Sequence, residues 1–104
     1  MMRLYWSARS PFVRKVLIAA AELGLVPRIE RVAMAIAQPK VNPDLVTLNP
    51  VGKIPLLQLE DGRVLGDSRV ICEYLDSLHD GPRLFPEGEA RWATLRWEAM
   101  GDGV

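Results

Sequence analysis

The sequence predicts an α/β domain with a mixed four-stranded sheet in the order β-α-β-α-β-β-α, followed by one further helix. Its size and composition, 104 residues with 49% hydrophobic and 25% charged, are typical of a chain with one hydrophobic core. A strand, a helix and a second strand open the chain, and this order implies a right-handed crossover between parallel strands. The dipeptide Asp61-Gly62 between two apolar segments then predicts an antiparallel hairpin.

The first strand and helix have the clearest signals. Arg3–Trp6 is short and rich in β-forming residues, so it predicts the first strand. Ser10 followed by proline is typical of a helix start, and Gly24 is typical of the residue after a helix end. The helix between them is apolar on most of its circumference, and we therefore expect it to be covered on two sides.

The remaining elements of this part follow in order. Arg28–Met34 predicts the second strand, and the three prolines within 35–50 allow only a short, irregular helix there. Two apolar segments flank the hairpin turn and predict the third and fourth strands, 55–59 and 63–65. A last helix begins at a cap, Asp67 or Ser68, and ends near His79. Its expected inner face consists of Val70, Ile71, Tyr74, Leu75 and Leu78.

The C-terminal segment has a different character. Residues 81–88 predict a linker, and 89–104 predict an amphipathic helix with two tryptophans, Trp92 and Trp97. This helix either folds back on the sheet domain, 1–80, or is the first helix of an all-α C-terminal domain whose remainder lies outside these residues. We favour the second interpretation, because a lone helix with two tryptophans has little to pack on.

Charge and cysteine usage exclude several classes of protein. Thirteen Lys and Arg balance thirteen Asp and Glu, so the chain lacks the basic surplus of a nucleic-acid binder. Uninterrupted apolar runs such as Val16–Ala21 reach only six residues, too few for a membrane span. The single cysteine, Cys72, cannot form an internal disulfide, and no Cys/His cluster predicts a metal site. We expect a cytoplasmic, metal-free protein.

Three stretches together give a more specific indication. They are SARSPFVRKV at 7–16, NPVGKIP at 49–55 and DSRVI at 67–71. In this order and spacing they resemble the N-terminal domain of the cytosolic glutathione transferases, and most closely the bacterial and the serine- or cysteine-type members. The resemblance implies a thioredoxin-like fold and a site for glutathione.

The first stretch would carry the catalytic group. The resemblance implies that the Ser10 hydroxyl donates to the glutathione sulfur, and a hydroxyl at a helix N-terminus favours a thiolate. The alternative is that Ser10 only caps the helix, and Ser7 is a nearby substitute for the catalytic role. Arg14 and Lys15 add positive charge where the helix dipole does not favour it, which suggests a purpose other than helix stability.

The other two stretches would hold the rest of glutathione. The resemblance implies a cis peptide bond between Ile54 and Pro55, with backbone groups of Ile54 holding the cysteinyl part. It also implies that Ser68 holds the γ-glutamyl carboxylate at a helix N-terminus and that Asp67 contacts the amino group. The alternatives are a proline that only begins a strand and a pair that only caps a helix. Lys40 and Lys53 would hold the glycyl carboxylate, unless they are solvated surface lysines.

The leading function is therefore a glutathione transferase, a detoxification enzyme that activates the glutathione thiolate for attack on a small electrophile. The alternative is a transferase-like interaction module without catalysis. A glutaredoxin-like reductase is disfavoured, because no cysteine stands at the start of the first helix. The exposed tryptophans also suggest a homodimer.

Overall fold

The computed structural model describes residues 1–7, 10–33 and 54–103 and contains the predicted sheet. Its elements are β1 (Met2–Trp6), α1 (Pro11–Glu22), a 3-10 helix η1 (Val26–Arg28), β2 (Ile29–Ala33), β3 (Leu56–Gln58), β4 (Val64–Leu65), α3 (Ser68–Asp76) and α4 (Glu89–Asp102). The expected helix within 35–50, together with Lys40 and Lys53, lies outside the described residues.

The strands pair in the spatial order β2-β1-β3-β4. β1 and β2 are parallel, with Met2 opposite Ile29, whereas β3 pairs antiparallel with both β1 and β4. At the hairpin turn Gly62 has φ +92°, a conformation that glycine adopts without strain. Both the parallel crossover and the hairpin predicted from the sequence are thus confirmed.

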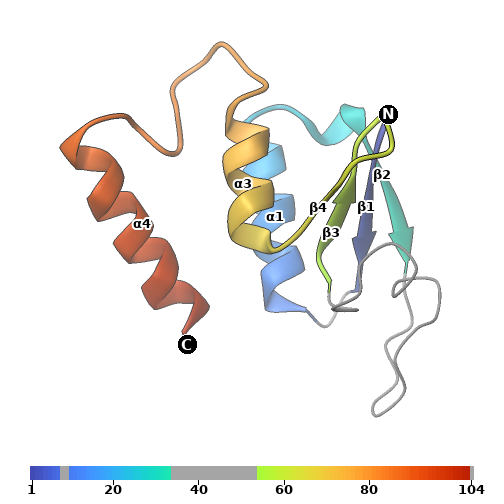
Figure 1. Ribbon diagram of the computed structural model, residues 1–104, viewed down its shortest axis with the longest axis horizontal. Coiled ribbons are helices and arrows are strands. Elements are labelled where there is room, and N and C mark those ends of the chain that lie inside the picture. The colour runs from blue at the N-terminus through green and yellow to red at the C-terminus, as the bar shows by residue number, and fades with distance from the viewer. Residues whose placement is uncertain (8–9, 34–53, 104) are drawn as a thin grey trace.

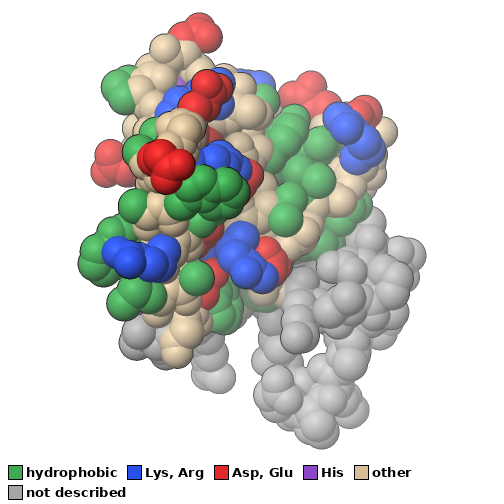
Figure 2. Space-filling view, turned by 60° about the vertical axis from the view of Figure 1, so that its left-hand side comes forward, with side chains coloured by type: hydrophobic (Ala, Val, Ile, Leu, Met, Phe, Trp, Pro, Cys, Tyr) green, Lys and Arg blue, Asp and Glu red, His purple; other side chains and the backbone are tan. Residues whose placement is uncertain are grey.

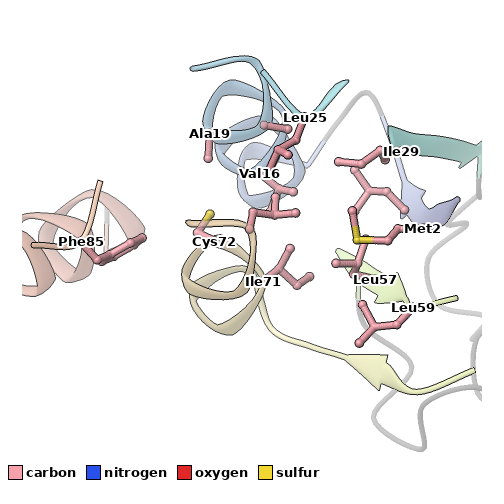
Figure 3. Close-up of a cluster of buried hydrophobic side chains, with 13 residues drawn as sticks. Met2, Val16, Ala19, Leu25, Ile29, Leu57, Leu59, Ile71, Cys72 and Phe85 are labelled. Carbon is pink, nitrogen blue, oxygen red and sulfur yellow. The ribbon is translucent and has the colours of Figure 1, made fainter. Parts of the chain in front are cut away.

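The hydrophobic core lies between the sheet and two helices. Figure 1 shows α1 and α3 side by side on one side of the strands, with α4 beyond them as an outer layer. Side chains of both helices point toward those of the strands (Figure 3), and Leu4, Leu57, Ile71 and Leu75 are fully buried. Cys72 belongs to this core as a small apolar residue, and burial raises the pKa of its thiol to about 12.

Caps fix both ends of α1. The Ser10 hydroxyl accepts from the Val13 N–H at 3.2 Å, as its place before proline predicted. At the other end Gly24 has φ +70°, and the Leu25 N–H donates to the Ala20 carbonyl in a Schellman motif. α1 packs against both the strands and α3, in agreement with the expected cover on two sides, and its outer side is exposed at Ile18, which is 60% exposed.

The buried face of α3 differs from the predicted one. Ile71, Cys72 and Leu75 are buried as part of the core, but Val70 is 47% exposed and does not belong to the inner face. The predicted Tyr74 and Leu78 are partly buried and pack against the core, and the helix also turns Ser68, Cys72 and Asp76 inward at a spacing of four residues. Regular helix also ends at Asp76, three residues before the predicted end at His79.

A buried carboxylate fastens the linker to α3. Asp76 is 2% exposed and accepts from the backbone N–H groups of Leu84 and Phe85 at 2.9 and 2.8 Å. His79 Nε2 lies 2.8 Å from the same carboxylate, and the Arg83 guanidinium donates to the Asp76 carbonyl. These contacts hold the linker against the end of α3, from which it leads to α4.

The face that α4 turns toward the other helices is largely polar. Arg91 and Glu98 lie on that face and are half-buried, whereas Trp92 and Trp97 are 65% and 63% exposed. Figure 2, which brings α4 forward, shows apolar side chains on the molecular surface among charged ones. Within the described ranges, no helix is long and apolar enough to cross a membrane.

Candidate functional site

Three predicted segments meet at one edge of the sheet. β1 ends at this edge and β3 begins there, because the two strands are antiparallel and Tyr5 lies opposite Leu56. Figure 1 shows that α1 and α3 also begin at this edge. Two helix N-termini with unpaired N–H groups therefore face the same region, and both favour a negatively charged ligand.

Ser10 lies at the start of α1 and is half-buried. Its oxygen accepts the capping hydrogen bond from the Val13 N–H, so the capping role expected for this serine is real. A hydroxyl has one proton to donate and two lone pairs to accept with. The cap occupies one lone pair, and the proton stays available to donate to a ligand atom.

The Ile54–Pro55 segment precedes β3. Its peptide bond is cis, the isomer that the resemblance implies, and a second cis bond joins Gly66 and Asp67. Pro55 is buried and Ile54 half-buried, and the pairing between β3 and β1 begins only at Leu56. The backbone groups of Ile54 therefore lie just beyond the ladder, at the edge where the helices begin.

Asp67 and Ser68 occupy the start of α3. Asp67 is its N-cap and accepts from the Arg69 N–H at 3.0 Å and from the Arg69 guanidinium at 3.3 Å. Burial acts to raise the pKa of the Asp67 carboxyl, but these hydrogen bonds outweigh burial and place the pKa below its usual value. Asp67 is thus an anion that a ligand ammonium group could approach.

The Ser68 side chain differs from that of its neighbour. Ser68 is 3% exposed, and its hydroxyl forms no hydrogen bond within the described ranges. None of the buried side-chain oxygen or nitrogen atoms among the described residues lacks a hydrogen-bond partner, so the unpartnered Ser68 oxygen reaches the molecular surface. A ligand carboxylate at the N-terminus of α3 could accept this hydrogen bond, in the positive field of the helix.

The structure brings Ser10, Ile54, Pro55, Asp67 and Ser68 to one edge. Lys40 and Lys53 lie outside the described residues. Among those residues there is also no group of three or more His, Cys, Asp or Glu side chains that could hold a metal ion. The described part of this edge offers hydroxyls, the Asp67 carboxylate, backbone groups and helix N-termini to a ligand.

Lys15 has a different role from the one that its position suggested. Its ammonium group lies 2.8 Å from Asp102 and 3.2 Å from Glu98, both on α4. Burial acts to lower the pKa of Lys15, but the hydrogen bonds to these two carboxylates outweigh burial and raise it. Lys15 thus connects α1 to α4, which explains a cation that does not match the helix dipole.

Sequence reasoning missed a groove between α3 and α4. It has a volume of about 620 Å³ and is lined in part by Gly66, Asp67, Val70 and Ala99. An ion pair between Glu73 on α3 and Arg91 on α4, with 2.7 Å between the charged atoms, also crosses between the two helices. Charges of both signs on α4 were the available signal, but their partners could not be identified from the sequence.

Matches to known proteins extend over most of the chain. Residues 9–78 match the family model described as "Glutathione S-transferase, N-terminal domain". The Escherichia coli protein YibF, named as an uncharacterized GST-like protein, is 33% identical over 99% of this chain and 50% of its own length. Glutathione S-transferase L1 of Arabidopsis thaliana is 36% identical over 86% of this chain and 37% of its own length.

A solved structure agrees in fold. A glutathione transferase family member from Pseudomonas fluorescens Pf-5, with bound glutathione, has a TM-score of 0.95 and 41% identity, over 99% of this chain and 51% of that one. The same protein was also solved with bound S-(propanoic acid)-glutathione, with a TM-score of 0.84. These matches confirm the thioredoxin-like fold, and the chain spans at most about half the length of these relatives.

Proposed function

The chain belongs to the glutathione S-transferase family, and we propose that it binds glutathione at the edge where α1 and α3 begin. The observation that carries the proposal is the Ser68 hydroxyl, which lies at the N-terminus of α3 and has no hydrogen-bond partner among the described residues. The γ-glutamyl carboxylate would accept from this hydroxyl and from the free N–H groups of α3. The adjacent Asp67 carboxylate would attract the amino group.

Ser10 would act on the sulfur. Its hydroxyl proton would donate to the thiolate while its oxygen keeps the capping bond from Val13. The N-terminus of α1 adds a positive field, so both effects favour the thiolate over the thiol and lower the pKa of glutathione. Ile54 would hold the cysteinyl backbone, and Lys40 and Lys53 would hold the glycyl carboxylate.

The reaction that follows would be conjugation. The thiolate sulfur would give an electron pair to an electrophilic carbon of a small molecule and form a carbon–sulfur bond. In a substitution the leaving group departs with its bonding pair, and in an addition the π pair of an activated double bond moves to its far end and takes up a proton. Since a relative was solved with a thioether of glutathione, we propose that the site also accepts a group attached to the sulfur. Conjugation of this kind would serve detoxification in the cytoplasm.

We further propose that residues 1–80 are the glutathione-binding domain, 81–88 a linker and 89–104 the first helix of a helical domain. The exposed Trp92 and Trp97 support this division, because further helices would cover them. Exposed apolar side chains also support a homodimer. Light scattering at tens of micromolar would detect a dimer, and a strict monomer would contradict that part of the proposal.

The test is a calorimetric titration of reduced glutathione into the folded chain and into two variants. Ser68→Ala should weaken binding by about tenfold, since it removes a hydrogen bond to a charged group. Ser77→Ala is the matched control, because Ser77 lies at the opposite end of the same helix. Equal affinity in the two variants would contradict the role of Ser68.

Absence of binding by a chain shown to be folded would contradict the proposed site. The alternative function, a transferase-like interaction module, would then be favoured. A chain that binds glutathione but conjugates no electrophile would support binding without catalysis.

A further inference from the structure

Two basic side chains differ from all others that the structure describes. Ten of the thirteen Lys and Arg residues fall in the described ranges, and eight of them have a polar or aromatic partner. In those ranges only Arg14 and Arg28 have no ion pair, side-chain hydrogen bond or ring contact. Both are exposed.

Arg14 lies beside the proposed position of the sulfur. Its backbone N–H donates to the Ser10 carbonyl at 3.2 Å, so the two residues are one turn apart on the same face of α1. Side chains on a helix lean toward its N-terminus. The long Arg14 side chain can therefore bring its guanidinium back to the level of Ser10.

The surroundings leave this charge available. The first turn of α1 contains no acidic residue, whereas the adjacent Lys15 is held by Glu98 and Asp102. Arg28, the other unpaired cation, lies in η1 just before β2, at the opposite edge of the sheet. Among the residues that the structure describes, Arg14 is thus the unpaired cation next to the candidate site, and Arg28 is a natural control.

We propose that Arg14 gives this site a preference for a carboxylate on the group attached to the glutathione sulfur. The inference rests on the proposed function, because it needs the sulfur beside Ser10. A guanidinium pairs with a carboxylate through two parallel hydrogen bonds, a geometry that a neutral group of the same shape does not reproduce. The substrates or products would be S-carboxyalkyl thioethers of glutathione.

The test compares two thioethers of nearly equal size, S-(2-carboxyethyl)glutathione and its neutral amide, S-(2-carbamoylethyl)glutathione. Each is titrated calorimetrically into the wild-type chain and into Arg14→Gln and Arg28→Gln, with circular dichroism to check folding. The wild-type chain should bind the carboxylate thioether about fivefold more tightly than the amide thioether. This ratio corresponds to the upper end of the free energies found for exposed ion pairs. Arg14→Gln should abolish this preference and Arg28→Gln should keep it.

Each other outcome overturns the inference in a recognisable way. Equal affinity of the wild-type chain for the two thioethers would overturn it while leaving glutathione binding intact. Loss of the preference in both variants would assign it to overall charge rather than to Arg14. If neither glutathione nor a thioether binds to the folded chain, the proposed function fails and this inference fails with it.

A salt titration adds an independent measurement. The preference for the carboxylate should shrink at 0.5 M salt, because the Debye length then falls to about 4 Å and exposed charges are screened. A preference that is unchanged at this salt concentration would contradict an exposed ion pair at Arg14.

Discussion

The layer formed by the sheet with α1 and α3 differs from α4 in what holds it in place. In the first region Leu4, Leu57, Ile71 and Leu75 are fully buried, whereas no residue of α4 is buried. α4 is attached to the other helices by ion pairs from Lys15 and Arg91 and by the linker that Asp76 fastens. Burial of apolar area therefore stabilises the first region, and charged contacts orient the second.

This difference shows that amphipathicity alone does not indicate which face of a helix is turned inward. The half-buried face of α4 carries Arg91, Glu98 and Asp102 around a single leucine, Leu95. Its large apolar side chains, Trp92, Trp97 and Met100, lie on the exposed side. Such a helix suits a position between two domains, in agreement with the proposed helical domain.

The largest expected effect is a loss of packing in the first region. Leu57→Ala should lower the free energy of unfolding by about 3 kcal/mol, since it removes buried methyl groups and leaves a cavity. Ile18→Ala, at an exposed position of α1, should change it by less than about 0.5 kcal/mol. Urea denaturation followed by circular dichroism measures both values. Similar values for the two variants would contradict the contrast between the core and the surface.

A smaller effect is expected at the connection between the two regions. Asp76→Asn should lower the free energy of unfolding by about 2 kcal/mol, because the amide cannot accept all the hydrogen bonds that the carboxylate accepts. Asp80→Asn, at an exposed position just before the linker, is the control and should be nearly neutral. Urea denaturation of both variants at neutral pH tests this difference.

The same carboxylate makes stability depend on pH. Burial acts to raise the pKa of Asp76, but the hydrogen bonds from His79, Leu84 and Phe85 outweigh it and lower the pKa. The contribution of this carboxylate to the free energy of unfolding should therefore be complete above its unfolded-state pKa of about 3.9. It should be lost as the pH falls through the lower folded-state pKa. A contribution that instead grows below pH 4 would contradict this sign.

The smallest effect should be found at α4 itself. Lys15→Gln removes the cation from Glu98 and Asp102. We therefore expect the free energy that holds α4 against α1 to fall by about 1 kcal/mol, and hydrogen exchange in α4 to become roughly fivefold faster. Arg14→Gln, one residue earlier and unpaired in the described structure, should leave the exchange rates unchanged. Exchange that is equally fast in both variants would argue against a specific contact.

The contact should also weaken at high pH. The two carboxylates raise the pKa of Lys15 in the folded chain, so the stabilisation from its ion pairs is complete below the unfolded-state pKa of about 10.4. It is lost as the pH rises through the folded-state pKa. Faster exchange in α4 at pH 11, after correction for the intrinsic rate, is the expected result.

Local signals in the sequence were sufficient for much of the fold. Ser10 before proline predicted the start of α1, and Gly24 predicted its end, because capping depends on neighbouring residues only. The Asp61-Gly62 hairpin was predicted for the same reason. The candidate site was predicted by resemblance as far as Ser10, Ile54, Asp67 and Ser68, which lie at the ends of elements that such signals locate.

Signals that depend on distant partners gave wrong or incomplete predictions. Val70 was expected on the inner face of α3, but contact with α1 and the sheet turned Ser68, Cys72 and Asp76 inward instead. Nothing in the sequence showed that Asp76 would accept from Leu84 and Phe85, since those groups are backbone atoms of a linker.

The sequence by itself determined the order of elements, the caps, the parallel pairing of the first two strands and the hairpin, because each depends on a short pattern or on the chirality of the chain. Only the tertiary structure decided which face of α3 and α4 is turned inward and which cation remains unpaired. Lys15 and Arg14 are adjacent and both basic, yet one is held by α4 and the other has no partner in the described structure. Their difference depends on which carboxylates folding brings within reach.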